Sequence, residues 1–235
     1  MTLPRLDSVE RSTLWDRVYF ALRSAVLAGR FAPGERVVLR QVANDLDVSL
    51  TPVRDAVNRL IAEKVLERGG LGPAGAAVVP QLDADQFSQL MTVRASLEPV
   101  AAAAAAADAT AEQVDAVERC LVEMKRSVEE HRTDDYLDAH YRFHFRIYDM
   151  CRMPIVQEII ESAWLRCAPT LNLARPEYNP GLKRYQRHLD AIAALRRHDG
   201  AAAAEAIRAD IESARADICA LLLKRQPPRA DRRAG

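Results

Sequence analysis

The sequence lacks the marks of several protein classes. Its 33 basic and 33 acidic side chains leave no net charge at pH 7, so no global positive field attracts nucleic acid. Any contact with DNA must therefore come from a local group of Arg and Lys side chains. The four cysteines form no Cys-x-x-Cys pair, which argues against a zinc ribbon or a redox motif and fits reduced thiols in the cytosol.

The sequence also has little that would direct it to a membrane. Residues 1–10 contain no apolar signal-peptide core. The longest unbroken apolar run, residues 100–107, is far shorter than the ~20 residues that a helix needs to cross a bilayer. We therefore expect a cytoplasmic protein with no membrane partner.

The first part of the chain combines helical periodicity with one short extended stretch. Apolar residues recur at helical spacing over residues 14–27, and Gly29 and Asp47 suit left-handed backbone at helix ends. Two short helices joined by a few residues, and then a hairpin, make up a winged helix-turn-helix. The sequence therefore predicts a DNA-binding domain of this type over residues 1–80. Its further elements are expected at residues 39–46, 49–61, 64–68 and 76–79.

Beyond residues 81–83, which we interpret as a linker, the extended signal disappears and helical periodicity continues. The fold class is thus mostly α, with the winged helix followed by an all-helical bundle over residues 84–225. Pro99 is expected to kink or split the first helix of the bundle. The Pro- and Arg-rich segment 226–235 is expected to be a disordered tail. Six helices are predicted in the bundle, at residues 84–107, 111–131, 134–151, 154–173, 178–198 and 201–223.

Three short motifs in the first domain carry a resemblance to a known family. They are residues 28–35, 39–43 and 48–56, which include a Pro-Gly-Glu turn and a Thr-Pro-Val-Arg entry to the third helix. This part of the chain resembles the winged helix of the GntR superfamily. The resemblance implies a homodimer that binds a palindromic operator in double-stranded DNA.

The second domain resembles the all-helical FCD type of the FadR-like branch of that superfamily. The matching residues are the Arg-x-x-Leu-Glu motif that begins at Arg94, the pair Phe143 and His144, and the later His188 and Asp199. The resemblance implies a domain that senses a small effector, often a carboxylate, and that dimerises. Repression is the commoner outcome in the family.

The start of the predicted third helix carries the candidate DNA contacts. In such domains this end enters the major groove, where short polar side chains suit phosphate contact and helix capping. Arg54 lies one turn in and can bind guanine O6 and N7 with both arms of its guanidinium. Leu50 stands where many relatives carry Arg, so we expect an operator that differs from the commonest family site. The candidates are Arg40, Ser49, Thr51, Arg54, Arg59 and Arg68, and the alternative is that these arginines are solvated surface residues.

A second candidate site is a metal centre. His140 and His144 are four residues apart on one predicted helix, so their rings project from the same face and can offer two nitrogens to a metal. The alternative is that they are ordinary core or surface histidines. The resemblance adds His188 and Asp210, and it implies that the acid and one imidazole of the usual ligand set have exchanged places here. Three imidazoles and a carboxylate suit Zn²⁺, with Ni²⁺ or Mn²⁺ as alternatives, unless the site has lost its metal and become a purely organic pocket.

Arg94 is the first candidate for binding an anionic effector, because Arg binds carboxylates with two parallel hydrogen bonds. The alternative is a structural salt bridge with Glu98 one turn away. Further candidates for lining the effector cavity are Tyr148, Trp164, Arg166 and Asn172.

Two rival functions remain at this point. A small metal-dependent hydrolytic enzyme would use the His/His/His/Asp set to activate water, but the sequence shows no Ser-His or Cys-His nucleophile motif, and the winged helix would have no purpose. A structural nucleoid protein with a degenerate pocket would bind DNA with little sequence preference and no effector response. We therefore expect a regulator of transcription, a repressor, that is not an enzyme.

Overall fold

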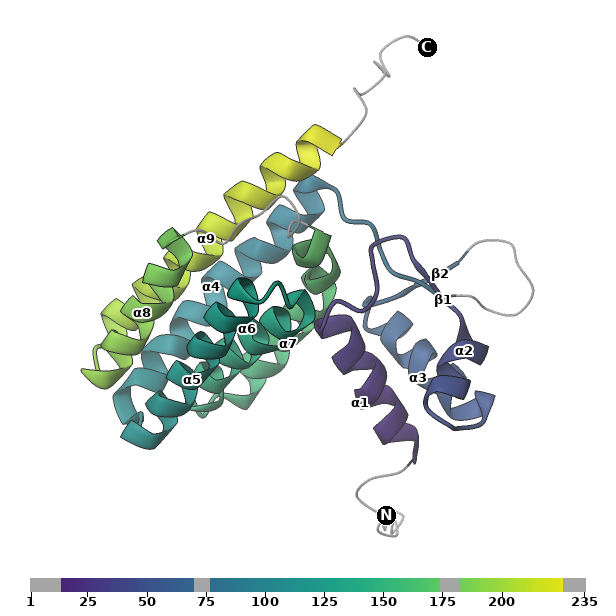
Figure 1. The fold of residues 1–235 in the computed structure, drawn as a ribbon, viewed down its shortest axis with the longest axis horizontal. Helices are drawn as coiled ribbons and strands as arrows, with labels where there is room; N and C mark the ends of the chain where they lie inside the picture. The colour runs from purple at the N-terminus through teal and green to yellow at the C-terminus, as the bar shows by residue number, and fades with distance from the viewer. Residues whose placement is uncertain (1–13, 70–76, 174–181, 226–235) are drawn as a thin grey trace, which may run out of the picture.

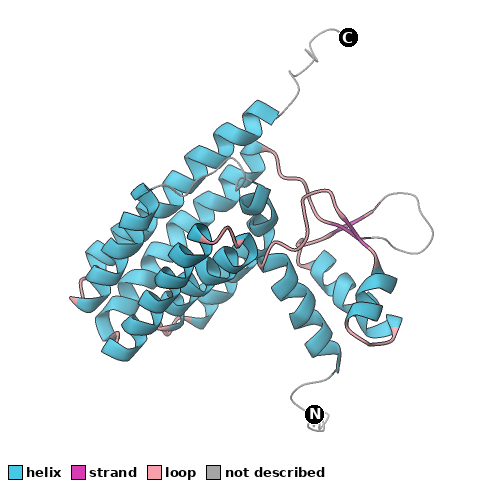
Figure 2. Ribbon diagram, in the orientation of Figure 1, coloured by secondary structure: helices cyan, strands magenta, loops and turns pink. Residues whose placement is uncertain are grey.

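The computed structural model describes residues 14–69, 77–173 and 182–225, except for the side chains of residues 133, 172–173 and 182–184. An N-terminal head lies beside a larger bundle of long helices (Figure 1). Within the described ranges, the strands all lie in the head (Figure 2). This architecture confirms the predicted fold class, mostly α with a winged helix-turn-helix followed by an all-helical bundle.

The described part of the head contains three helices and a small three-stranded sheet. The order of the strands is β1-β3-β2, and β3 pairs antiparallel with both neighbours. The first strand was not predicted, because two residues carry no recognisable period. The strand expected at residues 64–68 begins only at Glu67, since Lys64 has a φ of 59° and ends the preceding helix in left-handed backbone. The elements are α1 (Leu14–Leu27), β1 (Arg36–Val37), α2 (Leu39–Asp45), α3 (Leu50–Ala62), β2 (Glu67–Arg68) and β3 (Ala77–Val78).

The third helix of the head packs through the apolar stripe that the sequence predicted. Val53, Ala56, Val57 and Leu60 are all buried, and they form one core with residues of α1 and the sheet. The left-handed backbone expected at Gly29 and Asp47 is also present, with φ values of 69° and 50°. The opposite side of α3 therefore remains exposed.

All six predicted helices of the second domain are present, with ends that differ by a few residues. Each of them contributes buried side chains to one continuous core. None of the helices in the described ranges is long and apolar enough to cross a membrane. The helices are α4 (Ala84–Asp108), α5 (Ala111–Glu129), α6 (Thr133–Asp149), α7 (Pro154–Leu173), α8 (Leu182–Arg196) and α9 (Gly200–Arg225).

The predicted split of the first bundle helix at Pro99 is wrong, because α4 runs on from Ala84 to Asp108, whereas the alternative of a kink stays a prediction. Proline has no N–H, so the carbonyl of Ala95 one turn earlier loses its helical donor. Arg208 of α9 replaces that donor, with its Nη1 3.0 Å from the Ala95 oxygen. A neighbouring helix therefore compensates the proline.

The head rests on α7 of the helical domain. Leu165 of α7 is 2% exposed and belongs to the hydrophobic core of the head. One turn earlier, Glu161 forms an ion pair with Arg23 of α1 at 2.5 Å. The two domains therefore share an apolar contact and a charged contact on one helix.

The packing of α9 against α4 predicts the effect of one substitution. A Cβ at Gly200 would lie 2.9 Å from the backbone oxygen of Ala103, which cannot move aside as a side chain can. We expect Gly200→Ala to lower the free energy of unfolding by about 1–3 kcal/mol through this clash. Urea unfolding followed by circular dichroism measures it. Helix propensity alone favours Ala over Gly, so an equal or higher urea midpoint would contradict the close approach.

Candidate functional site

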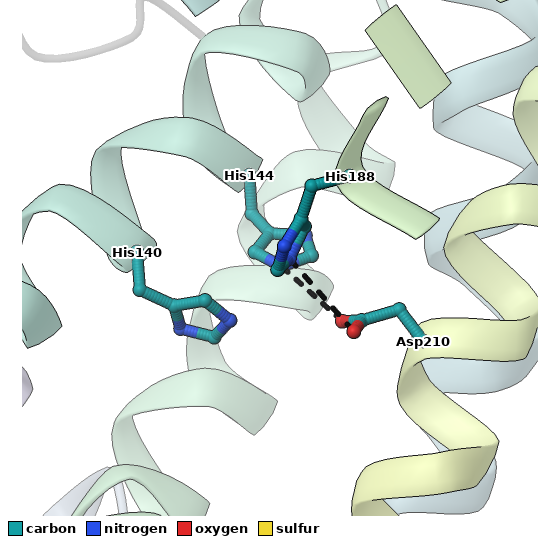
Figure 3. Close-up of side chains that lie close together, drawn as sticks. All are labelled: His140, His144, His188 and Asp210. Atoms are coloured by element: carbon teal, nitrogen blue, oxygen red, sulfur yellow. Dashed lines mark ion pairs between the residues drawn. The ribbon is translucent and has the colours of Figure 1, made fainter. Parts of the chain in front are cut away.

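Three helices bring the four predicted metal ligands together. His140 and His144 lie one turn apart on α6, His188 lies on α8 and Asp210 on α9. One ligand atom from each lies within 4.8 Å of the others, and the side chains point toward one another (Figure 3). His144, His188 and Asp210 are buried and His140 is partly buried. The structure thus assembles the predicted set inside the helical domain.

Two distances within this cluster are close to those between ligands that share a metal, and all four ligand atoms lie within 4.8 Å of one another. Nε2 of His144 lies 3.5 Å from Oδ2 of Asp210, and Nε2 of His188 lies 3.8 Å from Oδ1. Both distances exceed those of typical N–H···O hydrogen bonds. Two ligand atoms on a tetrahedral zinc ion with bonds of ~2.0–2.1 Å lie ~3.4 Å apart. Small movements of the side chains would complete such a site.

The aromatic surroundings of the imidazoles restrict their rings. The ring centroids of Phe143 and His188 are 4.6 Å apart, and that of Trp164 lies 5.2 Å from His144 and 5.5 Å from His140. An apolar wall of this kind excludes water and strengthens electrostatic interactions inside it. The cluster therefore lies in a packed interior rather than in a solvated groove.

A hydrogen-bonded chain leads from the cluster to a buried carboxylate. Nδ1 of His144 lies 3.0 Å from the hydroxyl of Tyr148, which donates to Glu98 at 2.5 Å. Burial and the charge of Glu98 raise the pKa of Tyr148 well above its ordinary value, so its hydroxyl keeps the proton. Tyr148, a predicted effector residue, thus lies directly behind a predicted metal ligand.

Arg94 forms the buried salt bridge with Glu98 that was the alternative to effector binding. Its guanidinium donates to both oxygens of Glu98, at 2.6 and 3.3 Å, and stacks 3.9 Å from the ring of Trp164. Burial disfavours the charge of Arg94, but Glu98 outweighs this effect and leaves the pKa of the guanidinium above its usual range. The side chain is only 3% exposed.

Arg166, another predicted effector residue, lies apart from the cluster. Arg166 lines a different cavity, a groove of about 590 Å³ between β2 of the head and α4. The side chain of Asn172 lies outside the described residues. Sequence reasoning also missed that Glu98 is the hydrogen-bonding centre of the domain. The only signal in the sequence was the four-residue spacing between Arg94 and Glu98, which indicated a salt bridge between them.

The predicted DNA contacts lie on the head. Arg40, Thr51 and Arg54 are exposed, and Ser49 is the N-cap residue of α3. The side chain of Ser49 makes no capping hydrogen bond, contrary to the expected capping role.

The two other candidate arginines differ in their surroundings. Arg59 is drawn toward the body of the head, where it contacts Glu63 at 3.2 Å and lies over the ring of Tyr19 at 3.7 Å. Arg68 is exposed on β2, beside the groove that Arg166 lines.

Comparisons with known proteins agree with this arrangement. Residues 14–72 match the model of the bacterial regulatory proteins of the gntR family, and residues 89–213 match the FCD domain. The chain is 28% identical over 178 residues to the HTH-type transcriptional regulator McbR of Escherichia coli strain K12, covering 76% of this chain and 79% of that protein. It is 22% identical over 191 residues to the HTH-type transcriptional repressor RspR of the same strain, covering 81% of this chain and 82% of that protein.

Solved structures show the same relationship. The structure of E. coli McbR/YncC superposes with a TM-score of 0.78 at 26% identity, covering 91% of this chain and 98% of that one. A putative GntR regulator from Rhodococcus sp. RHA1 shares the fold, with a TM-score of 0.70 at 20% identity over 91% of this chain and 99% of that one. These relatives are regulators of transcription, so the hydrolytic enzyme has no support. The FCD match spans more than half of the sequence, and the chain belongs to the GntR family as a DNA-binding transcriptional regulator with an FCD domain.

Proposed function

We propose that this regulator binds a palindromic operator as a homodimer in the cytoplasm, and that a small carboxylate effector controls its affinity for DNA. The effector binds at or near a divalent metal held by His140, His144, His188 and Asp210. One observation carries the proposal, the convergence of these four side chains from three helices in a chain that also carries a winged helix. Repression is the proposed direction, as in the relative RspR, which is named a repressor.

The buried donor atoms fit a metal. Nε2 of His144 is fully buried and has no hydrogen-bond partner among the residues that the structure describes. An imidazole nitrogen left in this way costs free energy unless a ligand satisfies it. Three nitrogens and a carboxylate oxygen are the ligand types that zinc prefers, and Ni²⁺ or Mn²⁺ also accept them. A bound metal would supply positive charge and open coordination positions for a carboxylate.

The effector's anionic group would meet the metal rather than Arg94. Glu98 already matches the charge of Arg94 and accepts two hydrogen bonds from one edge of its guanidinium. A second carboxylate at that position would be repelled by Glu98. We therefore assign Arg94 a structural role, with Tyr148 beside the ligands as the adjoining polar group.

The exposed arginines at the start of α3 and on α2 support sequence-specific contact with DNA. Arg54 would read a base in the major groove, and Ser49 and Thr51 would contact phosphates. Arg40 would add a further contact with DNA. Arg68 on β2 would add a backbone contact from the wing. Arg59 has the least support, because its half-exposed side chain already contacts Glu63 and the ring of Tyr19 on the surface of the head.

Helix α7 offers a route from the metal centre to the head. Trp164 contacts the rings of His140 and His144, and the next residue, Leu165, lies in the core of the head. Effector binding shifts the population of head arrangements only by the difference in its affinity for them. A helix that touches both regions can carry that difference.

The first prediction concerns metal content. Elemental mass spectrometry of the tag-free protein supplied with Zn²⁺ should find about one metal per chain. His188→Ala should lose it, because the substitution removes one of four ligands. Zinc at a hundred times its Kd should also raise the free energy of unfolding by about 2.7 kcal/mol.

His131→Asn is the matched control for this experiment. His131 is exposed and has a φ of 54°, which Asn tolerates, so this variant should keep its metal. A wild-type chain that binds none of Zn²⁺, Ni²⁺ and Mn²⁺ would refute the metal centre. Equal metal in wild type and His188→Ala would move the site elsewhere.

The second prediction concerns the operator. Arg54→Ala should weaken specific binding by about 1–3 kcal/mol and relax the preference at one base pair of each half-site. Fluorescence anisotropy with operator and scrambled DNA measures both effects. Arg119→Ala removes one exposed arginine of α5 and serves as the control for loss of charge. Specific binding that stays within about twofold for Arg54→Ala would rule out this base contact.

The third prediction concerns the coupling between metal and head. If α7 transmits the state of the metal centre, zinc should change operator affinity by about 5–150-fold in the wild type. Glu161→Gln weakens the ion pair with Arg23 and should bring this ratio closer to one, while zinc affinity without DNA stays the same. Operator titrations with and without zinc give the ratio. An unchanged ratio would exclude the ion pair from the coupling.

A further inference from the structure

Glu98 is the common acceptor for three helices of the domain. Its carboxylate is 0% exposed and accepts hydrogen bonds from Arg94 on α4, Tyr148 on α6 and Trp164 on α7. The Trp164 indole nitrogen lies 2.8 Å from Oε1, and the Tyr148 hydroxyl lies 2.5 Å from Oε2. These donors fix the orientation of the carboxylate and leave Oε2 facing Tyr148.

The direction of the next hydrogen bond follows from counting protons. A tyrosine hydroxyl has one proton, and that of Tyr148 is donated to Glu98. Its oxygen can therefore only accept from His144, 3.0 Å away. A neutral imidazole carries one proton, which must then lie on Nδ1. The lone pair of Nε2 is left facing Asp210, at 3.5 Å.

We propose that Glu98 and Tyr148 are positioning residues of the metal centre, which hold His144 in the tautomer whose Nε2 binds the ion. This inference rests on the proposed metal site and adds to it the residues that orient one ligand. Ligating histidines commonly donate their second N–H to such a partner, and loss of the partner weakens metal binding by about 10–100-fold. Here the carboxylate acts through an intervening phenol.

Arg94 and Trp164 complete this arrangement from the other side of Glu98. The guanidinium matches the negative charge of Glu98, and the indole donates to Oε1. Oε2 also accepts a longer hydrogen bond from Arg94, at 3.3 Å, and remains a strong acceptor for the Tyr148 proton. Because that proton is drawn toward Glu98, the phenol oxygen becomes a better acceptor for the N–H of His144.

Tyr148→Phe tests the inference, because it removes the hydroxyl and keeps the ring. We expect zinc affinity, measured by competition with a chromophoric chelator, to fall by about 10–100-fold. In the metal-free protein labelled with ¹⁵N-histidine, we expect wild-type His144 to show protonated Nδ1 and bare Nε2. In Tyr148→Phe that preference should be lost. A role in packing alone would not change the tautomer.

Tyr141→Phe is the matched control, since it makes the same change two turns earlier on the same helix. Tyr141 packs against Phe145 and Trp164, and it is not one of the proposed ligands or their hydrogen-bond partners. This variant should bind zinc as the wild type does. Thermal melting of both metal-free variants establishes that they are folded. The tautomer of His144 in the wild type tests the direction of the hydrogen bond without any variant.

The outcomes separate the two proposals. A wild type that binds no metal overturns the proposed metal site, and the positioning role falls with it. A wild type that binds zinc, with Tyr148→Phe within about twofold of it, overturns only the positioning role, since a lost partner should cost at least about tenfold. Equal losses of zinc affinity in Tyr148→Phe and Tyr141→Phe would assign the effect to packing and refute the positioning role. A wild-type His144 that is protonated on Nε2 would also refute it.

Discussion

A charged carboxylate buried in the helical domain constrains the helices around it. An isolated buried charge costs several kcal/mol, and removing one partner of a buried ion pair typically costs about 3–5 kcal/mol. Glu98 avoids this cost only where donors from α4, α6 and α7 all reach it, as Arg94, Tyr148 and Trp164 do. The position of α6, and with it that of His144, is therefore set partly by the need to satisfy Glu98. The proposed metal centre depends on this requirement, because two of its predicted ligands lie on α6.

The register of α9 is fixed by two contacts with α4. The backbone of Gly200 approaches Ala103, and Arg208 donates to the carbonyl of Ala95 that Pro99 leaves without a helical donor. The spacing between the two positions is the same on both helices, as expected for an antiparallel pair with equal rise per residue. Asp210 follows Arg208 by half a turn and faces the interior. The proline that the sequence marks as a helix breaker thus contributes, through its compensating arginine, to placing a proposed ligand.

The sequence predicted what depends on spacing within one helix. The apolar stripe of α3, the six helices of the bundle and the shared face of His140 and His144 all follow from helical periodicity. His188 and Asp210 came from resemblance, since nothing in local spacing joins α8 and α9 to α6. Packing between helices could not be predicted from the sequence, so the role of Arg94 stayed open. For the same reason Arg166 was expected to line the effector cavity, whereas it lines a different groove. The strand at Ala77–Val78 was predicted, whereas the strand at Arg36–Val37 was missed and the one at Glu67–Arg68 was predicted too long, because two residues are too few to show a period.

The exchange of acid and imidazole that the resemblance implies is compatible with the geometry. For four side chains that converge on one point from different helices, the kinds of ligand present decide whether a metal can bind. The order of those ligands along the chain matters less. With the acid on α9, His144 lies between two carboxylates. On the Nδ1 side the hydroxyl of Tyr148 connects the ring to Glu98, and on the Nε2 side the ring faces Asp210. Arg94 matches the charge of the first carboxylate. A divalent ion bound among His140, His144, His188 and Asp210 would match the second, so both buried acids would be neutralised while all three imidazoles stay uncharged.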